Sequence, residues 1–205
     1  FKVLDDEKMQ DLVESVRING VLTPVLLRMD DNEEYEMVSG HRRMHAAQLA
    51  GLTTIPAIVR ELSDDAAIVA MVDANIQREE LLPSEKAFAY KMKLDAMIRQ
   101  SGRPKDNGSQ VGNHLKGKKS IEVLAEEERK SKNQIHRFIR LTELIEPLRD
   151  MVDGIRSDGK KIAFNPAVEL SYLSKENQQL VVKNIEGLDL TPSHAQTIRM
   201  KELSR

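Results

Sequence analysis

The sequence predicts an α+β protein, with a small mixed α/β domain at its N-terminal end and an all-helical region after it. Short β-branched and aliphatic runs that suit strands are concentrated before residue 61. From residue 64 onward, apolar residues recur mainly at helical spacing. Aromatic residues make up only 3% of the chain and Trp is absent, so the core must consist of Leu, Ile, Val, Ala and Met, which favours helices.

Helix and strand patterns alternate in the first 60 residues. We expect a helix at 5–18 that stops at Asn19-Gly20, strands at 23–28 and 35–39 around a polar turn, a helix at 41–50 that ends at Gly51, and a strand at 54–60. Gly40 stands between the second strand and the second helix. These elements predict a small mixed sheet with helices.

The remaining elements are predicted to be helical. We expect helices at 64–76, 84–100, 120–128, 132–144, 145–153, 165–173 and 175–185, followed by a charged helix-like tail. Residues 101–119 are rich in Gly, Ser, Asn and Lys, which indicates a mobile linker.

Composition excludes several classes of protein. The absence of Cys removes disulfides, Cys-ligated zinc and thiol catalysis. No run approaches the roughly 18 apolar residues of a membrane span, and no signal peptide is evident, so we expect a cytoplasmic protein with no membrane partner. Residues 1–80 carry 8 Lys or Arg against 16 Asp or Glu, whereas residues 81–161 carry 18 against 12. The middle third is therefore the candidate surface for a polyanion.

The first candidate site is Gly40-His41-Arg42-Arg43, at the junction of a strand and a helix. A glycine lets the backbone approach a ligand, a helix start offers unpaired N–H groups, and two arginines add positive charge. All three features favour a phosphate. The alternative is a glycine turn followed by solvated arginines.

The second candidate site is Asn75-Ile76-Gln77-Arg78. The two amides could supply an oxygen ligand for a metal or phosphate, and the arginine could neutralise charge. The alternative is an ordinary helix end before a helix that starts with Pro83.

The third candidate site covers residues 120–141 and has the spacing of a helix-turn-helix. Leu124 and Ala125 on one helix and Ile135 and Phe138 on the next form its inner face. Arg129 stands where a glycine is common, and left-handed geometry there would cost about 1 kcal/mol. The residues expected to contact DNA are Lys119, Ser131, Lys132, Asn133, Gln134, His136, Arg137 and Arg140. The alternative is a helical hairpin with a solvated outer face.

Taken in order, these segments resemble the ParB/Noc family of partition proteins. Its first motif resembles GVLTPVLLR at 20–28, its arginine phosphate motif resembles YEMVSGHRRMHAAQLAGLTTIPAIV at 35–59, and its second phosphate motif resembles ANIQREELLPSEKA at 74–87. The helix-turn-helix follows at the expected place. Within the family, the sequence resembles members carried on mobile elements of Gram-positive bacteria.

The resemblance implies a ParB/sulfiredoxin-like nucleotide-binding domain at 1–80, a linking helix with a helix-turn-helix DNA-binding domain at 81–161, and a helical extension at 162–205. It implies a homodimer that loads on a palindromic centromere-like site in double-stranded DNA, binds CTP and Mg²⁺, and slides away as a closed clamp in plasmid or chromosome segregation. A Walker-type partition ATPase is the implied partner, and the implied location is the nucleoid.

Carried over by position, the resemblance places the nucleotide among residues of all three motifs. Thr23 and Pro24 would lie beside the cytosine and ribose, Gly40, His41, Arg42 and Arg43 at the phosphates, and Asn75, Gln77 and Arg78 at the metal and phosphates, with Asn75 as metal ligand.

Two positions depart from the family pattern, because His41 and Ala74 stand where the family usually has glutamates. Losing a carboxylate removes a hard oxygen ligand, so we expect nucleotide binding with at most slow CTP hydrolysis unless Asp73 compensates. A helix-turn-helix transcription regulator with a degenerate pocket stays open as an alternative, and so does an enzyme on the same N-terminal fold. The chain begins at Phe1 and the family's C-terminal dimerisation domain is not evident, so we expect it to be part of a longer protein.

Overall fold

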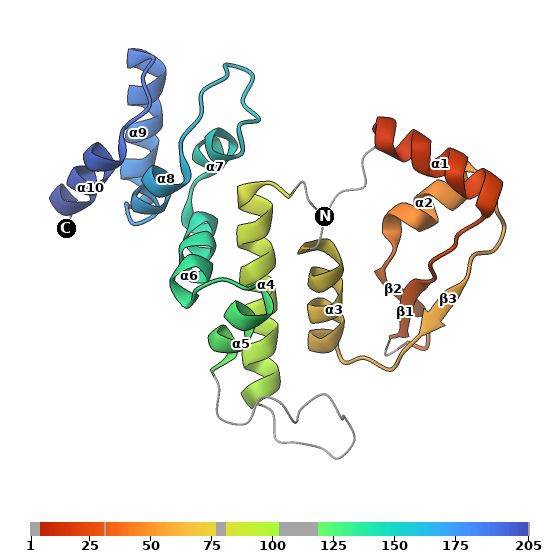
Figure 1. Ribbon diagram of the computed structural model, residues 1–205. Coiled ribbons are helices and arrows are strands. Elements are labelled where there is room, and N and C mark those ends of the chain that lie inside the picture. Colours follow the sequence, from red (N-terminus) through yellow and green to blue (C-terminus); the bar gives the residue numbers. More distant parts are fainter. Residues whose placement is uncertain (1–4, 31, 77–80, 103–118, 205) are drawn as a thin grey trace. The chain divides into compact units, whose positions relative to one another are not determined.

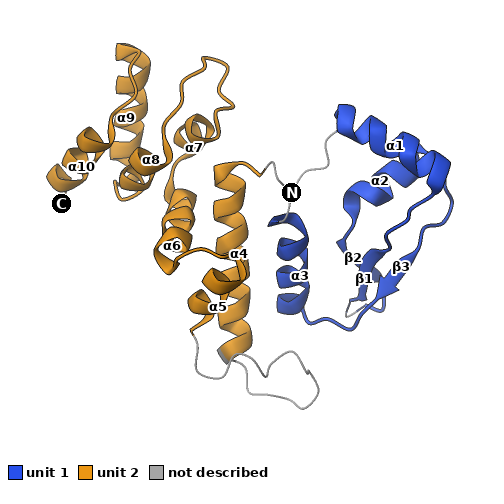
Figure 2. Cartoon of the chain, viewed as in Figure 1, with its two compact units in different colours: residues 1–78 blue, residues 79–205 orange. Residues whose placement is uncertain are grey.

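The computed structural model describes residues 5–30, 32–76, 81–102 and 119–204. The chain forms two compact units, residues 1–78 and residues 79–205 (Figure 2). The first unit contains every strand within the described ranges, and the second is helical there. The α+β architecture that the sequence predicts is confirmed.

The first unit is a three-stranded sheet with three helices. Its elements are α1 (Glu7–Asn19), β1 (Val25–Met29), β2 (Tyr35–Ser39), α2 (His41–Leu49), β3 (Ala57–Val59) and α3 (Asp64–Ile76). The strand order is β2-β1-β3, with β2 antiparallel and β3 parallel to β1. The third strand is shorter than predicted because Pro56 has no N–H to donate, although its carbonyl still accepts from the N–H of Val25 at 3.0 Å.

Helices α1 and α2 pack against one another and enclose the core of this unit (Figure 1). Met9 and Val16 of α1 meet Ala46 and Ala47 of α2, and all four are buried. Small residues on α2 allow the close approach. Asp6 is the N-cap of α1, and its carboxylate accepts from the N–H of Met9 at 2.9 Å.

Arg28 of β1 ties the sheet to the start of α3. Its Nε donates to Glu36 of β2 at 2.5 Å, and its Nη1 donates to Asp64 of α3 at 2.6 Å. The hydrogen bond to Asp64, followed by the one to Glu36, raises the pKa of the Arg28 guanidinium. The pairs therefore fix the first turn of α3, the helix that carries Asn75 at its other end.

The second unit begins with the 20-residue helix α4 (Figure 1). Its elements are α4 (Pro83–Gly102), α5 (Ser120–Glu127), α6 (Lys132–Arg140), the 3₁₀ turn η2 (Leu141–Glu143), α7 (Glu146–Asp153), α8 (Phe164–Leu170), α9 (Lys175–Leu188) and α10 (His194–Leu203). The predicted helix at 132–144 ends earlier than expected because its last turn tightens into η2.

One apolar core joins α4, η2 and α7 to the segment beyond residue 161. Its buried members include Ala87, Leu144, Leu148, Val168 and Ile185. The helices after residue 161 therefore share the core of the second unit.

Two polar contacts fix the helices around this core. The carboxylate of Asp153, at the end of α7, accepts from the N–H of Ser84 at 2.9 Å and from its hydroxyl at 2.5 Å. These bonds satisfy donors at the N-terminal end of α4, which that helix cannot satisfy itself.

The second contact is Gln178 of α9, which is fully buried. Its Oε1 accepts from the N–H of Ile145 at 2.8 Å, and its Nε2 donates to the carbonyls of Glu143 at 3.2 Å and Leu173 at 3.1 Å. The amide thereby satisfies backbone groups of Glu143 and Ile145, beside the end of η2, and of Leu173, between α8 and α9.

No helix in the described ranges combines the length and the apolarity that crossing a bilayer requires.

Candidate nucleic-acid and nucleotide sites

Helices α5 and α6 form the helix-turn-helix that the spacing predicts. Leu124, Ala125 and Ile135 are buried on its inner face. Arg129 adopts a φ of 51°, so the turn does use the left-handed conformation without a glycine. The N–H of Lys130 closes the turn by donating to the carbonyl of Ala125 at 2.9 Å.

The N-terminal end of α6 is satisfied by a reciprocal capping box. Ser131 Oγ accepts from the N–H of Gln134 at 3.1 Å, and Gln134 Oε1 accepts from the N–H of Ser131 at 2.9 Å. Lys132 extends from the first turn to Glu122 of α5, with 2.8 Å between Nζ and Oε1. This hydrogen bond is the largest cause that holds the pKa of Glu122 below its usual range.

The outer side of α6 is polar and exposed. Lys132, Asn133, Gln134 and His136 all lie in solvent, and Lys119, just before α5, is exposed as well. Donors and acceptors of these types read base edges or bind phosphates when their helix enters a major groove.

An aromatic cluster fixes the inner side of the same helix. Phe138 makes an edge contact with Tyr90 of α4, with 5.6 Å between ring centroids, and a tilted contact with Phe164 of α8 at 4.7 Å. The Tyr90 hydroxyl donates to Glu128 at 3.3 Å, and burial is the largest cause that raises the pKa of this phenol. The cluster thus ties α6 to both α4 and α8.

Arg137 is oriented by residues that the sequence reasoning missed. Its Nη2 donates to Asn165 Oδ1 at 2.6 Å, and its guanidinium carbon lies 5.4 Å from the centroid of the Phe164 ring. Asn165 is exposed at the N-terminal end of α8. A separation of 28 residues leaves no local pattern that could have linked the pair.

The Arg140 guanidinium makes two hydrogen bonds and a ring contact within the second unit. Its Nε donates to Ser171 Oγ at 3.2 Å, its Nη2 donates to the carbonyl of Ser171, and its guanidinium carbon lies 4.1 Å from the centroid of the Tyr172 ring.

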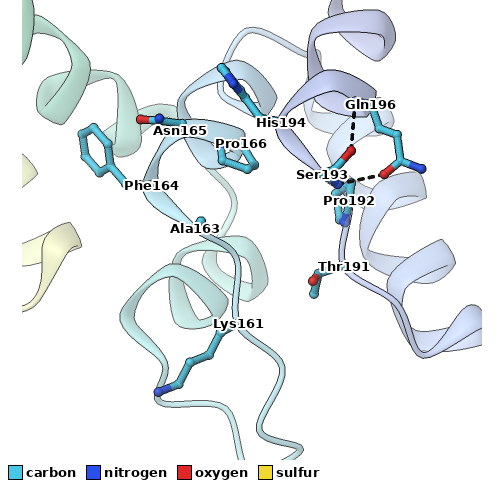
Figure 3. Close-up of a pocket in the computed structure, with 10 residues that line it drawn as sticks. All are labelled: Lys161, Ala163, Phe164, Asn165, Pro166, Thr191, Pro192, Ser193, His194 and Gln196. Atoms are coloured by element: carbon cyan, nitrogen blue, oxygen red, sulfur yellow. Dashed lines mark hydrogen bonds between the residues drawn. The ribbon is translucent and has the colours of Figure 1, made fainter.

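An open groove of about 720 Å³ lies between the N-terminal ends of α8 and α10 (Figure 3). Asn165, Lys161 and His194 are among its lining residues, but the last two point away from one another. Two donors at the start of α10, the N–H groups of Ser193 and Gln196, are used in a capping box. The groove therefore has no converging charges that would define a ligand.

In the first unit, Gly40 occupies a turn that requires a glycine. Its φ is 110°, and a Cβ built on it would lie 2.6 Å from Cγ1 of the buried Val25. Only glycine fits this close approach of the strand-to-helix turn to β1. Helix α2 begins at the next residue, so its first N–H groups have no partner within the helix.

The structure brings Arg43 together with the first predicted motif. Its Nη1 donates to the carbonyls of Thr23 at 2.7 Å and Pro24 at 2.5 Å. Arg42 faces Asp6 instead, with 3.6 Å between Nη2 and Oδ1, and His41 is exposed. Two of the three predicted segments thus meet around α2.

The third segment is described only in part. Asn75 is buried near the end of α3 and its Nδ2 donates to the carbonyl of Met71 at 2.7 Å, which leaves the oxygen as the atom a metal would bind. Ala74 is exposed, and Gln77 and Arg78 lie outside the described residues. Within the described ranges, no three His, Asp or Glu side chains form a cluster that could hold a metal ion.

Comparisons with known proteins agree with this arrangement. Residues 1–76 match the ParB N-terminal domain. A probable chromosome-partitioning protein ParB of Neisseria meningitidis is 34% identical over 184 residues, which cover 88% of this chain and 56% of the relative. A nucleoid occlusion protein of Geobacillus thermodenitrificans is 44% identical over 89 residues, which cover 43% of this chain and 31% of that protein. The chain therefore spans about half the length, or less, of these curated relatives.

Two solved structures are also similar. The C-terminally truncated ParB from Caulobacter crescentus, complexed to the centromeric parS site, covers the whole chain and 90% of its own, with 25% identity and a TM-score of 0.54. A Pnob8-like ParB-N domain, at 14% identity and a TM-score of 0.57, covers 99% of this chain and 90% of its own and supports the fold alone. Residues 1–76 therefore form a ParB N-terminal domain, and the chain is similar along most of its length to chromosome-partitioning proteins of the ParB/Noc family.

Proposed function

We propose that this chain is a sequence-specific DNA-binding partition protein that acts as a CTP-dependent sliding clamp in plasmid or chromosome segregation. The observation that carries the proposal is α6, which packs Ile135 inside and presents Lys132, Asn133 and His136 to solvent. The likeness to a ParB complexed to parS supports double-stranded DNA with a palindromic centromere-like site as the ligand. A homodimer suits such a site, because two-fold protein symmetry mirrors the palindrome.

The side chains on and beside the exposed side of α6 have separate roles in this proposal. Asn133 and His136 contact base edges, and Arg137, oriented by Asn165, reads a guanine. Lys132 exchanges Glu122 for a DNA phosphate. Lys119, at the N-terminal end of α5, and Ser131 and Gln134, at the N-terminal end of α6, contact the DNA backbone.

Anisotropy titrations with a short parS duplex and a scrambled duplex test the DNA-binding role. We expect Arg137→Ala to cost about 1–3 kcal/mol and to relax specificity, since it removes a base contact. We expect Lys132→Met to weaken both duplexes alike and to lower the salt slope by about 0.9. Lys183→Met, on the exposed side of α9, is the matched control. Equal affinity of the unaltered chain for both duplexes would refute the proposal.

The nucleotide-binding role rests on the turn at Gly40. CTP phosphates would bind the first N–H groups of α2 together with Arg42 and Arg43, beside Thr23 and Pro24. Arg42 would exchange Asp6 for a phosphate. Asn75 would supply one oxygen to Mg²⁺, which commonly takes most of its other ligands from phosphates and water. Gln77 and Arg78 complete the proposed site.

Calorimetry with CTP, ATP, GTP and UTP, with and without Mg²⁺, tests this role. We expect binding of CTP, and a loss of roughly ten- to a hundredfold when Arg42 and Arg43 are both replaced by Ala. Arg17→Ala, on the exposed side of α1, is the control and should bind normally. Unchanged CTP affinity in the double variant would refute the pocket, while normal duplex binding in that variant would separate the two roles.

A second candidate function is a transcription regulator whose nucleotide pocket is degenerate. Ala74 favours it, since the position offers no carboxylate for a metal. Absence of CTP binding in the presence of DNA would favour the regulator. If CTP binds, hydrolysis should be slow, and Ala74→Glu should raise phosphate release because it restores an oxygen ligand. A Walker-type partition ATPase remains the proposed protein partner.

A further inference from the structure

Arg140, the last residue of α6, caps a different helix. Ser171 follows α8 as its C-cap, and its carbonyl is one of the groups that a helix end leaves without an internal partner. The Arg140 guanidinium donates to that carbonyl through Nη2 and to the Ser171 hydroxyl through Nε. A cation at the C-terminal end of a helix also interacts favourably with the helix dipole. The contact therefore stabilises α8 as well as α6.

The neighbouring residue, Tyr172, extends this contact to α10. The guanidinium carbon of Arg140 lies 4.1 Å from the ring centroid, and the Nζ of Lys201 lies 4.4 Å from it. Lys201 is in turn paired with Glu169 of α8. We call Arg140, Ser171, Tyr172 and Lys201 the Tyr172 cluster. It joins the end of α6 to both α8 and α10.

The geometry points to Arg140 as a positioning residue for DNA recognition, one that fixes the end of α6 through the Tyr172 cluster without contacting DNA. This inference rests on the proposed DNA-binding function and adds α10 to the elements that control it. The Nε and Nη2 atoms of Arg140, which form one edge of its guanidinium, both donate hydrogen bonds to Ser171. The guanidinium also lies over the Tyr172 ring. A forked contact from that edge to a phosphate or guanine would require both interactions to break.

Three contacts along α6 together keep the helix in its orientation. A helix of nine residues is too short to hold its place by its own hydrogen bonds. Its middle is fixed by Phe138 and by Arg137 on Asn165, and its end by Arg140. Small rotations displace base-reading side chains, so a loosened end lowers affinity for the specific site and leaves the general attraction of DNA intact.

Substitutions at Arg140 separate positioning from direct contact in anisotropy titrations. Arg140→Lys keeps the charge but loses the planar fork. We expect it to lower affinity for a parS duplex about tenfold, with unchanged affinity for a scrambled duplex and an unchanged salt slope. Tyr172→Leu should give the same loss of affinity. Tyr172→Phe keeps the ring and should therefore bind normally. If Arg140→Lys binds normally, or if Arg140→Met lowers the salt slope by about 0.9, Arg140 is a phosphate contact and the inference is wrong.

A double-mutant cycle by urea unfolding tests the cluster without DNA. If Arg140 and Tyr172 act as one unit, Arg140→Met and Tyr172→Leu together should destabilise the chain no more than either alone. Additive effects would overturn the inference. The cycle needs no DNA, so it tests the Tyr172 cluster separately from the proposed function. Failure of the chain to bind parS would refute the proposed function and leave the result of the cycle unaffected.

Discussion

Gly40→Ala should destabilise the first unit, and two separate terms set the size of the loss. A residue with a side chain at a φ of 110° costs about 1–2 kcal/mol or more. The new Cβ would also lie 2.6 Å from Cγ1, 2.9 Å from Cβ and 3.2 Å from Cα of Val25. Overpacking of this kind typically costs about 1–3 kcal/mol. The reduced freedom of the unfolded chain offsets about 0.4–1 kcal/mol, which leaves a net loss of about 2–4 kcal/mol.

Urea unfolding monitored by far-ultraviolet circular dichroism measures this loss, and Gly51→Ala is the matched control. Gly51 also has a positive φ, of 79°, but no atom lies within 4 Å of the position that a Cβ would take there. The control therefore contains the backbone strain without the steric overlap. We expect the unfolding midpoint of Gly40→Ala to fall by about 1–2 M at an unchanged slope of about 2 kcal/mol per M, and that of Gly51→Ala to fall less.

Val25→Ala provides the second arm of the experiment. It removes Cγ1, the nearest atom, so in the Gly40→Ala background it should cost less than it does alone. The steric overlap should be relieved only in part, because the 3.2 Å contact between the new Cβ and Cα of residue 25 persists. Equal stability of the Gly40 and Gly51 variants, together with additive effects of Val25→Ala, would refute the steric argument.

Three further predictions concern polar contacts. Gln178→Glu replaces the donor to two backbone carbonyls with an oxygen, so we expect a loss of about 2–4 kcal/mol at pH 7 in urea unfolding. The introduced carboxyl should have a raised pKa in the folded state, so the loss should shrink in acid; a loss independent of pH would contradict this. Lys132→Met should raise the pKa of Glu122 toward 4.5 in an NMR titration, because the Lys132 hydrogen bond is the largest cause that lowers it. Since that pKa is lowered, the pair stabilises the fold above the unfolded pKa of Glu122 and stops doing so as the pH falls through the folded value; an unmoved titration would show that the pair is absent in solution. Asp153→Ala should cost about 1–2 kcal/mol and Ser84→Ala less, since the second change keeps the backbone N–H bond; equal losses by thermal unfolding would show that this bond adds nothing.

Local patterns were sufficient to predict most of the fold. The period of apolar residues located the helices, and the spacing of Ala125 and Ile135 located the helix-turn-helix, including the left-handed Arg129. Element ends were less accurate where hydrogen bonding rather than periodicity decides them. Pro56 shortened the third strand, and the 3₁₀ turn at Leu141 shortened α6.

The candidate sites were predictable only as residue types in order. The sequence indicated that Arg43 and Arg137 carry charge at useful places, but it held no sign of what each guanidinium contacts. Arg43 reaches back 20 residues to Thr23, and Arg137 reaches forward 28 residues to Asn165. Such partners depend on how helices cross, which no local spacing encodes. For the same reason the sequence held no sign that the Arg140 guanidinium contacts Ser171 and Tyr172.

The shortness of α6 has a consequence for evolution. At nine residues α6 is about 13.5 Å long, and its place depends on inner residues such as Ile135 and Phe138. Exposed positions such as Asn133 and His136 add little to stability, and surface substitutions usually change it by no more than about 0.5 kcal/mol. Mutation can therefore change the outer positions one at a time while the fold survives. If α6 reads DNA as proposed, related chains that keep this scaffold can change their DNA site, and a mobile element can acquire its own site without a new domain.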